Sequence, residues 1–418
     1  MTLAVVLTLG AVTGGRGQEL SGSVTPAGGA LPDGLALPSV PQNWADLPFK
    51  LTASQTVSYN SNISSFPVGV APKGAVLGDF TSTTNFGLST GANVENQRLF
   101  LDANFGVIRY LHDVEFNSTI YSLNAGVDWR VTSRCAGALT ASLSKSPSEL
   151  TEQVGTGVNY TTTNAFNETG KCAVSNGYSL LFNSGITTLT NSNAQNALNN
   201  TRTALLAAGI EYAKGESTIT ALASISDQNF TGRNALSAGG LATETDFHSF
   251  TLEYTREIDP NLSLTGLIGL VGVTSGFTLG LPKTLLPIYT LSARWSLTPK
   301  LALNVSAARS IAPPTTVIAN AQQSYNVGVN LVYQVTPKVS LTAGGSTDYS
   351  TGTFTSATPG ITPFLVSSQN TYNLSTGLIY SMTPFLSAAL NASYSERVAS
   401  HTITPQDIVT VSLNYRPY

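Results

Sequence analysis

Residues 325–341 read Tyr325-Asn-Val-Gly-Val-Asn-Leu-Val-Tyr-Gln-Val-Thr-Pro-Lys-Val-Ser-Leu341. Over the first nine residues, apolar or aromatic side chains occupy the odd positions and small or polar ones the even positions, with Val332 as the exception. Because successive side chains of a strand point to opposite faces, this alternation predicts a strand with one apolar and one polar face. Thr336-Pro337-Lys338 then interrupts it, since proline fixes its own φ and has no amide hydrogen for a ladder. The alternation resumes at Val339, so the stretch predicts a β-hairpin.

The same hairpin recurs about every 40 residues along the chain. Eight short turns separate alternating runs: Glu95-Asn96-Gln97, Thr132-Ser133-Arg134, Ser175-Asn176-Gly177, Lys214-Gly215-Glu216, Asp259-Pro260-Asn261, Thr298-Pro299-Lys300, Thr336-Pro337-Lys338 and Thr383-Pro384-Phe385. They predict about 18 strands, joined at the other end by loops of about 7 to 21 residues, the longest at 61–79, 227–244 and 349–369. Short turns at one end and long loops at the other are typical of bacterial outer-membrane barrels. We therefore predict an all-β fold, a transmembrane antiparallel up-and-down β-barrel with periplasmic turns and extracellular loops.

Composition agrees with a barrel that has a polar interior. Charged residues make up 10% of the chain, against about 25% in soluble domains, and Ser, Thr, Asn and Gly replace them. We expect an inner wall that is polar but mostly uncharged. The net charge of −3 gives no reason to expect nucleic acid as a partner. No apolar run is long enough for a membrane-spanning helix.

Three segments are predicted along the chain. Residues 1–17 contain a short apolar run and a Gly-rich stretch, as in a secretory signal peptide, although the usual basic start is missing; a first buried strand is the alternative. Residues 18–49 are rich in Pro, Gly and Ala without periodicity, which predicts a periplasmic lead or a segment that plugs the barrel. Residues 50–418 form the predicted barrel.

Aromatic side chains mark both ends of the predicted strands. The predicted girdle consists of Tyr121, Trp129, Tyr212, Tyr254, Tyr289, Trp295, Tyr325, Tyr333, Tyr372, Tyr380 and Tyr415. Three pairs on one strand are eight residues apart, which corresponds to roughly 20 Å of height in a tilted strand, close to the apolar band of an outer-membrane barrel. A soluble β-sandwich would alternate too, but it has no reason to collect aromatics at both strand ends. We therefore expect outer-membrane lipid and lipopolysaccharide around the barrel.

The opposite parity defines the predicted pore lining. It comprises Asp102, Asn104, Asn124, Asp128, Arg130, Glu211, Glu253, Arg294, Asn326, Asn330, Asn414 and Arg416, among many Ser and Thr residues. An 18-stranded barrel is wide enough for an aqueous channel. The charges are sparse and mixed in sign, unlike an ion-selective lining, whereas hydroxyls and amides suit hydrogen bonds to sugars.

The first outer loop is unusually apolar, with Phe66, Pro67, Val68 and Val70. One interpretation is that this loop folds inward and narrows the pore. The alternative is contact with lipopolysaccharide or with a neighbouring subunit.

The two cysteines fall at the ends of adjacent predicted strands. Cys135 follows one short turn and Cys172 precedes the next, so antiparallel pairing would bring them level near the periplasmic rim. An oxidising periplasm favours a structural disulfide. The alternative is two separate small apolar residues.

No pattern in the chain indicates catalysis. His112, His248 and His401 are the only histidines, and they are not spaced as metal ligands. No Gly-x-Ser-x-Gly elbow is present. We predict no catalytic site, metal or cofactor, although a barrel lipid hydrolase and a structural or adhesive barrel with a blocked lumen stay open as alternatives.

Three stretches resemble a known family: Gln55-Thr-Val-Ser-Tyr-Asn-Ser-Asn-Ile63, Gln97-Arg-Leu-Phe-Leu-Asp-Ala-Asn104 and Tyr121-Ser-Leu-Asn-Ala-Gly-Val-Asp-Trp129. They are similar to the β-barrel porin type 2 family, which includes outer-membrane proteins of exopolysaccharide-biosynthesis operons. The resemblance covers most of residues 50–418 and implies a secreted barrel that passes polysaccharide or small solutes. The chain departs from the usual terminus, because Pro417-Tyr418 follows the in-phase Tyr415 that the barrel-assembly machinery would read.

The expected function is a porin-like outer-membrane channel that passes carbohydrate, for polysaccharide export or saccharide diffusion. The alternative is a general-diffusion porin for small hydrophilic solutes. Periplasmic export components are a possible further partner, at the short turns.

Overall fold

The computed structural model describes residues 49–63, 68–69, 77–147, 159–192, 197, 200–233, 243–274, 285–312, 321–353, 368–399 and 402–416. The strands are β1 (Phe49–Asn60), β2 (Asp79–Val94), β3 (Gln97–Tyr110), β4 (Ser118–Arg130), β5 (Cys135–Pro147), β6 (Tyr160–Ser175), β7 (Tyr178–Asn191), β8 (Thr201–Lys214), β9 (Ser217–Phe230), β10 (Glu244–Asp259), β11 (Leu262–Thr274), β12 (Leu285–Thr298), β13 (Leu301–Ala312), β14 (Ala321–Thr336), β15 (Val339–Thr353), β16 (Ser368–Ser381), β17 (Leu386–Ala399) and β18 (Thr402–Tyr415). A single turn of 3-10 helix, η1 (Val114–Phe116), lies between β3 and β4. The predicted segments 1–17 and 18–49 lie outside the described residues, except Phe49, which begins β1.

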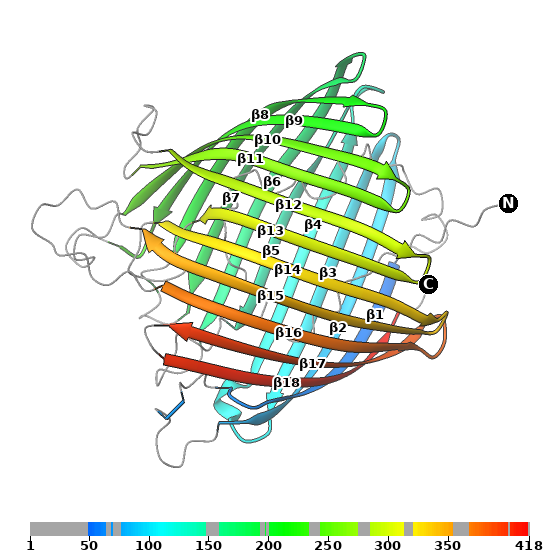
Figure 1. Ribbon diagram of the computed structural model, residues 1–418, viewed down its shortest axis with the longest axis vertical. Coiled ribbons are helices and arrows are strands. Elements are labelled where there is room, and N and C mark those ends of the chain that lie inside the picture. The colour runs from blue at the N-terminus through cyan, green and yellow to red at the C-terminus, as the bar shows by residue number, and fades with distance from the viewer. Residues whose placement is uncertain are drawn as a thin grey trace, which may run out of the picture.

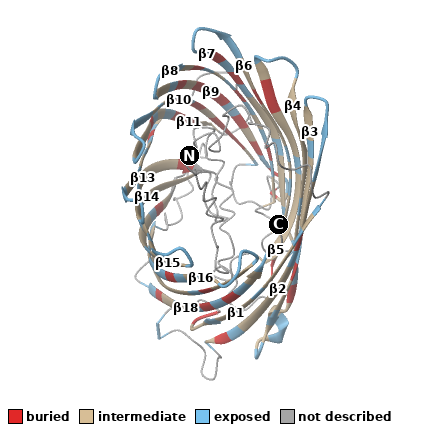
Figure 2. Cartoon of the chain, turned by 90° about the vertical axis from the view of Figure 1, so that its right-hand side faces the viewer, coloured by how far each residue is buried: buried red, intermediate tan, exposed pale blue. Residues whose placement is uncertain are grey.

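The strands form one closed sheet. Each strand pairs antiparallel with the next one in sequence, and β1 pairs with β18, so the 18-stranded sheet has no free edge. Figure 1 shows the strands running obliquely across the molecule, and Figure 2 shows them enclosing an elongated ring. Closure satisfies the edge hydrogen bonds that an open sheet would leave exposed. The predicted antiparallel up-and-down barrel of about 18 strands is confirmed.

All eight predicted turns join consecutive strands at one end of the barrel. In the three Thr-Pro or Thr-Ser turns that begin at Thr132, Thr336 and Thr383, the threonine hydroxyl accepts hydrogen bonds from the backbone two and three residues on, at 3.0 to 3.3 Å. This side-chain bond stabilises a turn locally. The turn at Asn176-Gly177 is different: both residues have positive φ, 24° and 87°, as a tight hairpin whose turn matches the strand twist requires.

The long-loop end contains one exception to the predicted loop lengths. Only residues 400 and 401 separate β17 from β18, whereas we expected at least about seven residues in each outer loop. The Thr402 hydroxyl donates to the Ala399 carbonyl at 2.6 Å. The alternation runs through Val398 and Ile403, so the strands pair almost to the tip.

Exposed apolar side chains predominate on one face of the sheet around its whole circumference. Leu206 is 65% exposed, Ile268 63% and Leu374 62%, and most of the predicted aromatic girdle shares this face. Such a continuous apolar exterior is unfavourable in water and stable in hydrocarbon. Among the described residues, no helix is long and apolar enough to cross a membrane.

Candidate functional site: the inner wall of the barrel

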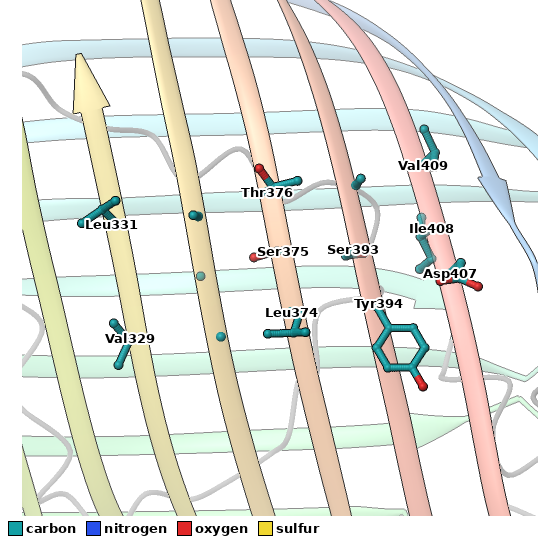
Figure 3. Close-up of a pocket in the computed structure, with 14 residues that line it drawn as sticks. Val329, Leu331, Leu374, Ser375, Thr376, Ser393, Tyr394, Asp407, Ile408 and Val409 are labelled. Carbon is teal, nitrogen blue, oxygen red and sulfur yellow. The ribbon is translucent and has the colours of Figure 1, made fainter. Parts of the chain in front are cut away.

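The strand register separates the residues of the barrel into two faces. Direct cross-strand partners share a face, and the pairing runs around the whole barrel, with four register shifts beside short turns, in β6, β10, β12 and β14. Figure 3, viewed from outside with the far wall behind, shows Leu331, Leu374 and Tyr394 on the near side of their strands. The alternate residues Ser375 and Ser393 lie on the far side, toward the lumen. Alternation therefore assigns the inner and the outer face of every strand.

The register places the predicted pore-lining residues on the inner parity, except Arg416, which follows the last residue of β18. Partners such as Asp102 with Asn124, Arg294 with Asn304 and Asn330 with Asn304 occupy neighbouring strands on this face. The predicted girdle residues occupy the outer parity, where Tyr121 pairs with Phe105, and Tyr415 pairs with Ala53 of β1 and Leu386 of β17.

Uncharged polar residues run continuously around part of the inner wall. One row crosses six consecutive strands by direct register: Ser306, Gly328, Ser346, Asn373, Ser395 and Gln406. The Asn373 amide donates to the Ser346 hydroxyl at 3.3 Å, and the Ser395 hydroxyl donates to the Gln406 amide oxygen at 3.5 Å. Each group keeps further donor or acceptor capacity for water or a solute.

On the inner wall, asparagine and glycine residues are direct register partners on neighbouring strands. Four register pairs have this composition: Gly87 with Asn104, Gly106 with Asn85, Gly185 with Asn167 and Gly377 with Asn391. A Cβ atom on any of these glycines would meet the partner's amide oxygen at 2.1 to 2.7 Å. The amide therefore lies flat over the glycine instead of projecting into the lumen. The arrangement keeps the channel wide and lines it with amide groups.

Two ion pairs compensate charges on the inner wall. Lys171 Nζ lies 2.6 Å from Glu211 Oε1, and Arg98 lies 3.7 Å from Asp128. The sequence identified Glu211 and Asp128 but missed their basic partners, which come from other strands. Paired charges of opposite sign leave little net field to select ions.

The inner wall also contains an apolar cluster that the sequence analysis did not expect. Phe247, Leu267, Val271 and Ile288 take the inner parity of β10, β11 and β12, and Ile311, on the outer parity at the end of β13, belongs to the same cluster. All five are at most 5% exposed. The expectation of a polar inner wall was therefore wrong for this part of β10–β12. These strands carry apolar residues on both faces, so alternation alone could not reveal the cluster.

The structure joins Cys135 and Cys172 by a disulfide, and the two residues are direct register partners of β5 and β6. Next to it, a row on the outer face reads Trp129, Gly137, Gly170 and Phe182 across four strands. The two rings lie over the glycines and stack at 6.2 Å between centroids. The disulfide and the ring contact together fix this part of the wall.

The apolar first outer loop is described only in part. Val68 is 69% exposed, and its backbone N–H donates to the Ile403 carbonyl at 2.9 Å, beside β18. Phe66, Pro67 and Val70 lie outside the described residues. Inward folding of this loop stays a prediction.

Three carboxylates that the sequence analysis did not group meet at the extracellular end of β9 and β10. Asp227 and Asp246 are register partners, and the ligand oxygens of Asp227, Glu244 and Asp246 lie within 4.8 Å of one another. Such a spacing could hold a cation, but acidic groups often cluster without one. They lie on the parity opposite to the pore lining, so we assign them no part in the channel.

The pairing, the closure and the apolar exterior define the class of protein. It is a transmembrane β-barrel of the kind found in the bacterial outer membrane. No protein-family model matches the chain, and no curated protein matches it.

Solved structures align with most of this chain. The FrpB iron transporter from Neisseria meningitidis aligns with 85% of this chain and 62% of that chain, at 10% identity and a TM-score of 0.51. OccAB4 from Acinetobacter baumannii aligns with 90% of this chain and 99% of that chain, at 9% identity and a TM-score of 0.47. The outer membrane protein opdK from Pseudomonas aeruginosa aligns with 88% of this chain and 99% of that chain, at 11% identity and a TM-score of 0.46. The FrpB alignment, at 10% identity, shows the fold alone.

Proposed function

We propose that the protein is a passive outer-membrane channel for hydrophilic solutes and that neutral or weakly charged carbohydrate is its main cargo. The observation that carries the proposal is the uncharged row of Ser, Asn and Gln side chains across β13–β18, which keeps hydrogen-bonding capacity toward the lumen. Sugar hydroxyls both donate and accept hydrogen bonds, so amides and hydroxyls can replace their water shell. The resemblance to exopolysaccharide-associated porins supports polysaccharide export as one form of this activity.

A general-diffusion porin is the second candidate. The two ion pairs of the inner wall, Lys171 with Glu211 and Arg98 with Asp128, favour a general porin as much as a saccharide channel. The reason is that a wall without net charge does not reject small neutral solutes of any kind. The two candidates differ in affinity: a saccharide channel binds sugar along its wall, whereas a general porin only sieves by size.

Single-channel conductance of the refolded protein in a planar bilayer, titrated with neutral oligosaccharides, tests the proposal. A large, weakly ion-selective conductance that added sugar chains block supports carbohydrate passage. A large conductance that is indifferent to sugar would leave general diffusion as the function. Absence of any conductance, both in the full chain and in a chain lacking residues 18–49, would contradict an open channel of either kind.

A pair of variants on one strand assigns the effect to the inner wall. Asn373→Ala removes an amide from the row on β16, and Thr376→Ala changes the outer face of the same strand. We expect sugar block to weaken several-fold in the first variant, since a hydrogen bond contributes about 1 kcal/mol, and to stay unchanged in the second. Equal effects from both would mean that the row does not bind sugar.

A further inference from the structure

The cationic side chain of Arg309 lies among aromatic residues on the outer face, at the extracellular end of the barrel. Tyr289, Arg309, Tyr325 and Tyr349 are successive register partners on β12, β13, β14 and β15. Tyr289 and Tyr325 belong to the predicted aromatic girdle. The row therefore lies at the level where the apolar band of the barrel ends and lipid headgroups begin.

The neighbours of Arg309 hold its guanidinium in place. Arg309 Nη2 donates to Gln323 Oε1 at 3.2 Å, and Arg309 Cζ lies 5.3 Å from the centroid of the Tyr325 ring. The Gln323 amide in turn donates to the Tyr325 hydroxyl. The Tyr325 and Tyr349 rings lie 6.0 Å apart. A long side chain that is already ordered loses little further entropy when it binds a ligand.

The charge of Arg309 is not neutralised within the described part of the chain. None of the ion pairs formed by described residues includes Arg309. Its Nε atom is buried and has no hydrogen-bond partner. A guanidinium on the lipid-facing side is unfavourable unless an anion pairs with it, and its planar fork of donors fits the oxygens of a phosphate.

An apolar groove lies deeper on the same face. It has a volume of about 640 Å³ and crosses β14 to β18, with Val329 and Leu331 at its β14 edge (Figure 3). Ala343, Gly345 and Thr376 are small enough to leave it hollow between larger neighbours. Val329 is four residues past Tyr325 on β14, a distance of about 13 Å along the strand toward the periplasm. The groove therefore begins at the depth that acyl chains reach.

We propose that Arg309, supported by Gln323 and Tyr325, binds the phosphate of an outer-leaflet lipid whose acyl chain occupies this groove. The inference goes beyond the channel function, because every residue in it lies on the outer face. Arg309 lies at the girdle, with the apolar groove below it. This arrangement favours a lipid over a soluble phosphate, because a soluble phosphate has no acyl chain to bury in the groove. Arg309 and the groove thus form a lipid site on one side of the barrel.

Lipid binding to the detergent-solubilised full chain tests this proposal. The probes are diphosphoryl lipid A, phosphatidylcholine and inorganic phosphate, and native mass spectrometry counts the bound molecules during titration. We expect Arg309→Ala to weaken lipid A binding roughly tenfold, since one charge-assisted contact disappears. Arg309→Lys should have an intermediate effect, because it keeps the charge but loses the fork. Thr376→Leu, which fills the groove, should weaken lipid A binding while leaving Arg309 intact.

Arg109→Ala is the matched control. Arg109 is exposed on the outer parity near the extracellular end of β3, and its register partner is Ser82, whereas Arg309 has a tyrosine as its partner on each side. Equal loss of lipid A binding from Arg109→Ala and Arg309→Ala would overturn the proposal in favour of a general charge effect. Unchanged binding in Arg309→Ala, or complete displacement of the lipid by inorganic phosphate, would also overturn it. Loss of a dimer rather than of bound lipid would identify a second copy as the occupant and would equally contradict it. Conductance should be the same in all four variants, so this test and the channel test fail independently.

Discussion

Removal of the Cys135–Cys172 disulfide should destabilise the barrel by an amount that follows from its loop length. The bridge closes a loop of 37 residues. In the chain-entropy model this loop restricts the unfolded chain by about 13 cal/mol/K, or about 4 kcal/mol at 25 °C. The two residues are already register partners, so the bridge requires no rearrangement of the folded sheet.

The assay is reversible denaturant unfolding of the barrel in detergent micelles, with free energies from linear extrapolation. We expect Cys135→Ser, Cys172→Ser and the double variant to lose the same free energy of unfolding, because either single change removes the whole cross-link. A reductant should lower the stability of the natural chain by a similar amount and leave the variants unaffected. Ala141→Ser, on the outer parity of β5, controls for an added hydroxyl on the lipid-facing side.

Two results would refute the reasoning. If the double variant lost about twice as much as each single one, the individual side-chain environments would dominate instead of the cross-link. If a reductant left the stability of the natural chain unchanged, the unfolded chain would not be restricted by the loop at all.

Three further predictions concern the wall. Gly170→Ala should destabilise the barrel by about 1–3 kcal/mol because the new Cβ would meet the phenyl ring opposite it at 2.0 Å, whereas Gly266→Ala, with nothing within 4 Å, should be nearly neutral in the same unfolding assay. Lys171→Met should lower the free energy of unfolding by about 3 kcal/mol, because it leaves the buried carboxylate of Glu211 unpaired. Adding Glu211→Gln should restore most of that stability. Equal losses in the single and the double variant would mean that the ion pair is not the cause. Gly377→Ala should fold normally but push the side chain of Asn391 into the lumen, so single-channel conductance should fall measurably. An unchanged conductance would mean that the amide does not lie against the pore wall.

The sequence alone determined the elements that depend on local order. Period-two alternation from Tyr325 to Tyr333 gives a strand, and Thr336-Pro337-Lys338 gives a turn, because both follow from backbone sterics and from the preferences of single residues. Repeated eight times, these signals give the strand number and the two faces. They also place Cys135 and Cys172 at the same end of adjacent strands, because each lies beside a short turn, whereas their direct pairing across the long loop between β5 and β6 is a result of the sheet register.

Only the tertiary structure decided which side chains meet across strands and around the closed barrel. Lys171 of β6 meets Glu211 of β8, with β7 between them, so no local sequence pattern identifies the two residues as partners. Asn60 on β1 and Ile408 on β18 pair only when the barrel closes. The apolar cluster around Phe247 and the isolated charge of Arg309 also depend on the register of strands joined by long loops. Alternation is a property of one strand, whereas register across a loop is fixed by closure and packing of the whole sheet.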